Sequence, residues 1–234
     1  MQQIHTAFGT RYNTPLIADA AFRAKAEIAV PHPGIVPLVE HHAIAGAVRT
    51  VNANNDLVAI IAAVGRAAPG EVVVIANAIG DAGLIGDLIG TDAKRRGLAG
   101  VIVDGLVRDV PALVELGLPV FCRGRCPVGP LKLAPELRGT GELDIEVSVG
   151  QSTVRPGMWT FGDQDGVIFV AADDLPAVTA EAERALERES AVLEALERGS
   201  SLSELLAVEE FLELRAAEPS ADFNAHLAAK GRAI

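Results

Sequence analysis

Three short apolar runs lie close together in the middle of the chain and alternate with stretches of helical character. They are VVVIA at 72–76, VIV at 101–103 and PVFC at 119–122. A run of this length without a polar residue is typical of a strand that is covered on both faces. The intervening segments predict a helix that ends near Gly97 and a shorter one at 111–116. Because strand–helix–strand repeats favour parallel pairing, the sequence predicts an α/β fold built on a parallel sheet.

The segments before this unit add further elements of the same kinds. Residues 14–28 predict a helix, with Thr14 as its N-cap and Pro15 at the first helical position. Strand-like residues at 43–51 come next. Residues 56–67 have apolar side chains at helical spacing and are followed by a Pro-Gly pair, which predicts a second helix.

The character of the sequence changes after the third apolar run. Residues 140–172 contain several strand-like runs broken by Gly and Pro, with no helix between them. Residues 175–198 are rich in Ala, Glu, Leu and Arg and predict a long helix, and 203–215 predict another. We therefore expect one main domain over residues 1–200 and a C-terminal helical extension over residues 201–234.

Charged residues follow the apolar runs, although a charged side chain contributes no apolar packing to a buried strand. Arg108 and Asp109 come soon after the run at 101–103, and Asp87 lies in a glycine-containing loop that leads from the run at 72–76 into a helix. Parallel α/β sheets bind ligands outside the carboxyl ends of their strands. We therefore expect these side chains to meet at one edge of the sheet.

The three side chains suggest metal chemistry. Two carboxylates facing one pocket repel each other unless a cation lies between them. Mg²⁺ accepts one or two carboxylates and keeps waters that substrate oxygens can replace. The guanidinium of Arg108 can stabilise an oxyanion that develops on a polarised carbonyl group. The free backbone N–H groups of Leu88 and Ile89, just beyond Asp87, can receive a carboxylate or phosphate at the start of the helix.

Spacing alone also fits a plainer arrangement. Arg108 and Asp109 can form a solvated ion pair, and Asp87 can simply cap a helix. Asp104 is expected to bond to the backbone of the turn that follows it, and Arg123 can either line the pocket or lie at the surface. The GxGxxG and GxxxxGK[ST] motifs are absent, which excludes the common dinucleotide and phosphate loops.

Composition narrows the classes of partner. The formal net charge of −11 disfavours a nucleic-acid binder, which neutralises phosphates with Lys and Arg. The chain has no apolar run long enough for a membrane helix and no secretory signal, so we expect a cytoplasmic protein with no membrane partner. Cys122 and Cys126 lack a second Cys or His pair at metal spacing, which favours two reduced thiols.

Several blocks resemble the RraA-like family, which includes class II pyruvate aldolases acting on 4-hydroxy-4-methyl-2-oxoglutarate and 4-carboxy-4-hydroxy-2-oxoadipate. The family pattern is an Asp, twenty residues, then Arg-Asp, which matches Asp87 and Arg108-Asp109. The surrounding blocks are GDL at 86–88, AGVIVDGLVRD at 99–109, PVFCRG at 119–124 and DGVIFV at 165–170. The resemblance covers about residues 14–200, with Met158 in PGM where the family usually has PGD.

The resemblance implies a role for each matched residue. Asp109 would bind Mg²⁺ or Mn²⁺ directly, and Asp87 would hold metal-bound water. Arg108 would contact the keto oxygen of a 2-oxo acid substrate and stabilise the pyruvate enolate. The backbone N–H groups of Leu88 and Ile89 would receive the substrate carboxylate.

The resemblance also implies a fold and an assembly. The fold is a layered αββα arrangement of the swivelling-domain type, here with a C-terminal helical extension. The active site would lie between subunits of a homotrimer, often stacked into a hexamer. A glutamate from the neighbouring subunit's C-terminal helix would complete the outer shell of the metal. Its position before Gly199 favours Glu189, with Glu183, Glu187 and Glu194 as nearby alternatives.

Two functional hypotheses follow. The first is a metal-dependent carbon–carbon lyase that cleaves a 4-hydroxy-2-oxo acid by a retro-aldol reaction, or decarboxylates oxaloacetate, through a pyruvate enolate. The second is a non-catalytic regulator, because some members of the family bind and inhibit RNA-degradation proteins. An intact set of Asp87, Arg108 and Asp109 favours the lyase, since a pure binding protein does not need it.

Overall fold

The computed structural model describes residues 8–9, 11–31, 33–77 and 82–230. The chain divides into two compact units, residues 1–179 and 180–234. Helix α6 (Leu175–Glu197) begins in the first unit and continues into the second. The expected division into a main domain over residues 1–200 and an extension over residues 201–234 stays a prediction.

The first unit is built on a ten-stranded sheet with the strand order β1-β12-β11-β3-β4-β6-β7-β2, in which β5 pairs with β6 and β8 with β3. β3, β4, β6 and β7 are parallel, and β5 is parallel to β6. The strands are β1 (Ile28–Ala29), β2 (Val36–Pro37), β3 (Ile44–Asn52), β4 (Val72–Ala76), β5 (Gly83–Ile85), β6 (Gly100–Val107), β7 (Val120–Arg125), β8 (Glu142–Leu143), β11 (Trp159–Asp163) and β12 (Gly166–Val170). The predicted α/β fold class is confirmed.

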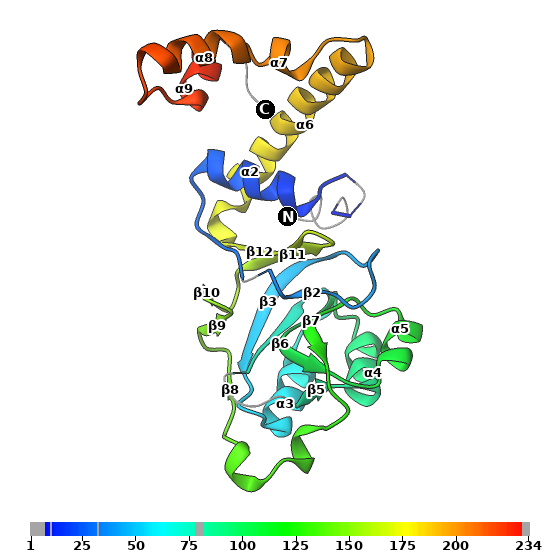
Figure 1. Ribbon diagram of the computed structural model, residues 1–234. Coiled ribbons are helices and arrows are strands. Elements are labelled where there is room, and N and C mark those ends of the chain that lie inside the picture. The colour runs from blue at the N-terminus through cyan, green and yellow to red at the C-terminus, as the bar shows by residue number, and fades with distance from the viewer. Residues whose placement is uncertain (1–7, 10, 32, 78–81, 231–234) are drawn as a thin grey trace. The chain divides into compact units, whose positions relative to one another are not determined.

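Helices and a hairpin cover the sheet (Figure 1). α3 (Leu57–Arg66), α4 (Asp87–Arg95) and α5 (Val110–Leu116) pack over the parallel strands, and α2 (Thr14–Ala24) lies against β11 and β12. On the opposite face of the parallel strands, the core includes residues of the hairpin β9 (Val147–Val149) and β10 (Ser152–Val154). All five residues of β4 are buried, because both of its faces are covered. This explains the apolar run from which the parallel sheet was predicted.

Strand β6 is longer than the sequence indicated. It runs to Val107 instead of ending at Val103, with an irregular register against β7 between Val103 and Leu106. The end expected at Val103 was wrong because the charge of Asp104, which suggested a loop, is compensated inside the fold. Its carboxylate pairs with Arg123 on β7 and accepts a hydrogen bond from the N–H of Gly150 at 2.6 Å. Arg108 and Asp109 therefore follow β6 directly.

The start of α2 also differs from the prediction. The N-cap is Asn13, whose side chain accepts from the N–H of Leu16 at 2.9 Å. Thr14, which we expected in that role, instead donates its N–H and its hydroxyl to the Asp163 carboxylate at 2.7 and 2.6 Å. A partner 149 residues away in the sequence thus changed the role of Thr14.

The second unit contains the rest of α6 and three short helices: α7 (Leu202–Leu205), α8 (Val208–Ala217) and α9 (Phe223–Ala229). The single helix predicted at 203–215 is divided because Ala207 adopts a left-handed backbone conformation, with φ 51°. Phe211 and Phe223 pack with their ring centroids 4.8 Å apart. In the part of the chain that the structure describes, none of the helices combines the length and apolar character that a membrane span requires.

Close packing at the centre of the sheet gives a stability prediction. A Cβ on Gly100 would lie 2.5 Å from Ile44 Cδ1 and 2.5 Å from the carbonyl oxygen of Pro119. Because backbone cannot yield as a flexible side chain does, Gly100→Ala should lower the free energy of unfolding by about 1–3 kcal/mol in urea denaturation. The control is Gly65→Ala in α3, where the nearest atom to the added Cβ belongs to Arg96 and is 3.9 Å away. Because alanine favours a helix more than glycine does, this variant should raise the free energy of unfolding by about 1 kcal/mol at most. Equal stability of the two variants would contradict this account.

Candidate active site

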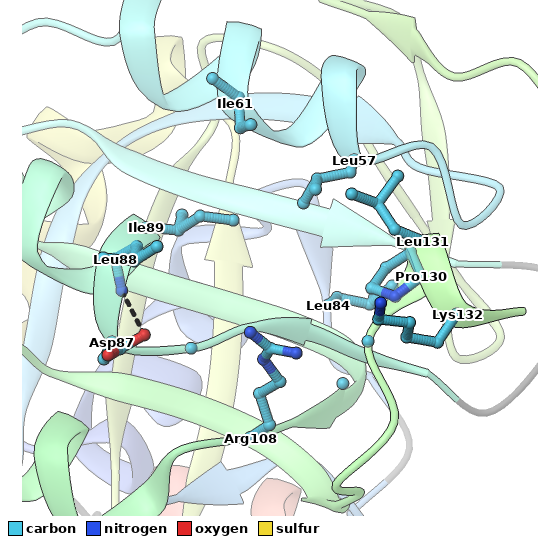
Figure 2. Close-up of a pocket in the computed structure, with 13 residues that line it drawn as sticks. Leu57, Ile61, Leu84, Asp87, Leu88, Ile89, Arg108, Pro130, Leu131 and Lys132 are labelled. Carbon is cyan, nitrogen blue, oxygen red and sulfur yellow. Dashed lines mark hydrogen bonds between the residues drawn. The ribbon is translucent and has the colours of Figure 1, made fainter.

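A cavity of about 260 Å³ opens where β5 and β6 end and α4 begins (Figure 2). Its wall is mostly apolar, with charged groups from Asp87, Arg108 and Lys132. In Figure 2 the side chain of Arg108 extends into the pocket between Asp87 and Lys132. The lining residues are Leu57, Ile61, Gly83, Leu84, Gly86, Asp87, Leu88, Ile89, Arg108, Gly129, Pro130, Leu131 and Lys132.

Asp87 and Arg108 both line this pocket, and Asp109 contacts the two of them. Asp87 is the first residue of α4, and Arg108 and Asp109 follow β6. The Oδ2 atom of Asp109 lies 3.2 Å from Nε of Arg108 and accepts from the backbone N–H of Asp87 at 3.4 Å. The Arg108–Asp109 ion pair of the plainer alternative is therefore present, and its arginine lines the pocket while Asp109 lies directly behind it. Its two side chains are 40% and 39% exposed, so solvent and ligands can reach both.

The backbone turns sharply at Asp109. This residue has φ 53° and ψ 39°, in the left-handed region, where it precedes α5. Asp tolerates that region better than most residues because its short polar side chain can bond locally. The N–H of Arg108 donates to the carbonyl oxygen of Ile85 at 2.9 Å, which ties the turn to β5. Strain at a residue of this kind is a feature often found at functional sites.

The start of α4 has the N–H groups expected to receive an anion, and one of them is already in use. The N-cap residue Gly86 contributes no side-chain hydrogen bond. The N–H of Leu88 instead donates to Oδ1 of Asp87 at 2.7 Å, as Figure 2 shows, and the side chain of Leu88 is 78% exposed. A substrate carboxylate would replace Asp87 at this N–H. The expected role of Leu88 and Ile89 thus requires the Asp87 side chain to rotate.

The donor set suits a hard divalent cation. Asp87 and Asp109 supply two carboxylates on either side of the turn that carries Arg108, and their oxygens are hard ligands. Mg²⁺ or Mn²⁺ binds oxygen ligands and completes its shell with water or substrate. The described residues contain no group of three or more His, Cys, Asp or Glu side chains arranged to hold a metal ion. Water, substrate or another chain could supply further ligands.

Glu189, the acid expected from a neighbouring subunit, lies on α6 in the second unit and is half-buried. Nothing in a single chain relates it to another chain's pocket, so its role stays a prediction.

Two residues near the sheet edge have structural partners. We expected Asp104 to bond to the turn that follows it, but its carboxylate bonds to Arg123 and to the backbone of Gly150. Arg123 is outside the pocket lining and holds β7 to β6 through this pair. The pair explains the charged residues at this edge without a catalytic role.

His41, His42 and the two cysteines are not among the residues that line this pocket. His41 and His42 line a separate cavity of about 400 Å³, together with residues of the β11–β12 turn. Burial, followed by the charges of His41 and Lys94, lowers the pKa of His42. Cys122 and Cys126 are free thiols, and burial raises the pKa of Cys122. Free thiols are what the sequence predicted for the two cysteines.

Sequence reasoning missed the wall formed by residues 129–132. Gly129, Pro130, Leu131 and Lys132 line the pocket from a 3₁₀ turn that covers Pro130–Lys132. In the sequence CPVGPLK they are typical of an ordinary loop. A loop lysine carries no signal of its own, so only the fold reveals that it faces Arg108 and Asp87.

The fold and the pocket define an α/β protein with an acid–arginine–acid site at the edge of a parallel sheet. The family model described as Aldolase/RraA matches residues 14–169. The chain therefore belongs to the RraA-like family.

Individual relatives extend this comparison. A Halalkalibacterium halodurans protein named "Putative 4-hydroxy-4-methyl-2-oxoglutarate aldolase" is 38% identical over 58% of this chain, and the match spans 63% of that relative's length. An uncharacterized protein of Methanocaldococcus jannaschii is 30% identical over 85% of this chain and 91% of its own. The solved structure titled RNA-processing inhibitor RraA from Thermus thermophilis has a TM-score of 0.56 at 25% identity, covering 65% of this chain and 90% of that one.

Proposed function

We propose that this protein is a divalent-metal-dependent carbon–carbon lyase. Its substrate would be a 2-oxo acid, cleaved by retro-aldol reaction of a 4-hydroxy-2-oxo acid or by decarboxylation of oxaloacetate. The observation that carries the proposal is that Arg108 and Asp87 line one pocket and that the Asp109 carboxylate bonds to the Arg108 side chain and to the Asp87 backbone. The aldolase name of the Halalkalibacterium halodurans relative supports the same chemistry.

Asp109 and Asp87 would hold the cation, Asp109 directly and Asp87 through water. The bound Mg²⁺ or Mn²⁺ would supply Lewis-acid polarisation of the substrate's 2-oxo group. Two carboxylates at a solvent-accessible rim fit such an ion, because it needs open positions for substrate oxygens.

The remaining steps belong to the protein's own groups. The N–H groups of Leu88 and Ile89 would bind the C1 carboxylate at the start of α4, where the helix dipole favours negative charge. In the retro-aldol reaction the 4-hydroxyl proton would pass to a water molecule, and O4 would become the carbonyl oxygen of the second product. The C3–C4 bond would break, and its electron pair would form the pyruvate enolate. Arg108 would donate hydrogen bonds to the enolate oxygen as its charge develops. One proton from water at C3 then completes pyruvate.

Assembly is part of the same proposal. A homotrimer or hexamer would bring Glu189 of the neighbouring subunit to the outer shell of the cation. Light scattering of the purified protein would give the oligomeric state. Glu189→Gln should then weaken metal binding while leaving the mass of the assembly unchanged.

The decisive experiment is a pyruvate-release screen over oxaloacetate and branched 4-hydroxy-2-oxo acids, with added Mg²⁺ or Mn²⁺. We expect release from at least one substrate, loss of that release in excess EDTA, and recovery when Mg²⁺ or Mn²⁺ is restored. Chelation should act this way because the polarising charge is not supplied by the protein alone. Release that is insensitive to EDTA would refute metal dependence, and no release from the whole panel would refute the lyase.

A non-catalytic role is the alternative, favoured by the similarity to the Thermus thermophilis RraA structure. Such a protein would bind a ribonuclease or another RNA-degradation protein and inhibit it. The acidic charge of this chain suits a protein partner better than RNA itself. Binding to a purified RNA-degradation endonuclease with inhibition of RNA cleavage, in a preparation that releases no pyruvate, would favour this alternative.

A further inference from the structure

Three glycines surround the side chain of Arg108 along its length. A Cβ on Gly83 would lie 2.9 Å from Cβ of Arg108, and one on Gly86 would lie 3.0 Å from Cγ and 3.1 Å from Nε. A Cβ on Gly129 would lie 2.7 Å from Nη1. The arginine thus runs through a space that exists because these positions have no side chains.

Gly129 differs from the other two in what it would displace. Its hypothetical Cβ has three nearest atoms, and all three belong to the Arg108 guanidinium: Nη1, Cζ at 3.4 Å and Nε at 3.8 Å. On Gly83 the Cβ would also strike the backbone oxygen of Cys126 at 2.7 Å, and on Gly86 it would strike Oδ2 of Asp109. Of these three positions, 129 is therefore the one at which an added methyl group would contact the guanidinium before any other group.

The backbone of Gly129 does not need glycine. Its φ is −85° and its ψ is 162°, an extended conformation that any residue adopts. The residue is buried and precedes the 3₁₀ turn of Pro130–Lys132. The physical advantage of glycine at this position is thus the room it leaves beside Arg108, not a backbone requirement.

The wall that carries Gly129 is tied to the strands of the site. The N–H of Gly83 donates to the carbonyl oxygen of Val128 at 2.8 Å, and the N–H of Cys126 donates to that of Val107 at 2.9 Å. These bonds fix the segment just before Gly129 to β5 and to the end of β6. A methyl group added at 129 would therefore move the guanidinium, because the backbone just before Gly129 is held.

We propose that Gly129 is a positioning residue for Arg108: the missing side chain at 129 lets the guanidinium lie in the pocket while its Nε stays beside Asp109. This inference builds on the lyase function proposed above. Reaction rates depend steeply on the placement of a group that stabilises charge, and a displacement of about 1 Å can cost about 10²-fold. Gly129→Ala should thus act on catalysis while leaving the fold intact.

A double-mutant cycle tests the coupling. Gly129→Ala should lower kcat for pyruvate release by about 10- to 100-fold, with a smaller change in KM. In an Arg108→Ala background the same change should have almost no further effect, because the group that it displaces is gone. The matched control is Gly65→Ala, whose added methyl group touches nothing closer than 3.9 Å. Equal losses in both backgrounds would overturn the proposal.

A second measurement does not depend on any activity. The Nε–Hε NMR signal of Arg108, assigned by its absence in Arg108→Lys, should shift in Gly129→Ala and remain unchanged in Gly65→Ala. The midpoint of thermal unfolding should stay at the wild-type value. An unshifted signal, or a variant that fails to fold, would overturn the positioning role. If the wild type releases no pyruvate from any substrate, the lyase proposal fails, and the NMR shift still decides the role of Gly129.

Discussion

Replacing Arg108 with alanine is expected to lower kcat for pyruvate release from oxaloacetate by about 10²–10³-fold. The guanidinium reaches into the pocket that Asp87 also lines, with its Nε 3.2 Å from Oδ2 of Asp109, so it is placed to stabilise an enolate oxygen as charge develops there. A steady-state assay with saturating Mg²⁺ measures the effect. Arg108→Lys should recover only part of the loss, because an ammonium group lacks the planar fork of donors.

The matched control for this prediction is Arg125→Ala. Arg125 is an exposed arginine at the end of β7, outside the pocket lining, so its loss removes the same charge from the same region. Its kcat should stay close to that of the wild type. Turnover of Arg108→Ala near the wild-type value, with a folded protein by circular dichroism, would end the proposal that this arginine serves the chemistry.

The second large effect is expected from Asp109→Asn. Asparagine tolerates the left-handed backbone at this position and can still accept a hydrogen bond from Arg108, so the turn should survive. The variant lacks the negative charge that a divalent cation requires. Titration calorimetry should show Mg²⁺ or Mn²⁺ binding weakened by more than about 100-fold, and metal-stimulated pyruvate release should fall in parallel.

Asp165→Asn provides the control for this charge removal. Asp165 is exposed in the turn between β11 and β12, and it faces a different cavity. Metal affinity and turnover should therefore match the wild type. Unchanged metal binding in Asp109→Asn would show that the cation, if it is needed at all, binds elsewhere.

Local patterns were enough to predict the centre of the fold. The apolar run at Val72–Ala76 is a strand with those bounds, because every one of its residues is buried and no polar side chain complicates the pattern. The order of strands and helices then placed Asp87 and Arg108 at the same sheet edge, since parallel strands bring their carboxyl ends together. The convergence of the site residues could thus be predicted, although their chemical roles remain predictions.

Features that depend on distant partners could not be predicted in this way. The end of β6 was misplaced because the charge of Asp104 suggested a loop, whereas Arg123 and the backbone of Gly150 compensate it. Thr14 was expected to cap α2 because it precedes the helical pattern directly. The Asp163 carboxylate that binds Thr14 instead comes 149 residues later, where a local pattern cannot indicate it. Lys132 and Gly129 reach the pocket only because hydrogen bonds hold their loop against β5 and β6.

The strand order also constrains how this chain can fold while it is being synthesised. β3 pairs on one side with β4, which follows soon after it, and on the other side with β11, which begins at Trp159. The parallel core can therefore assemble early, but one edge of β3 stays open until most of the first unit has left the ribosome. Exposed strand edges promote aggregation. The nascent chain is thus most vulnerable between the emergence of β7 and that of β11.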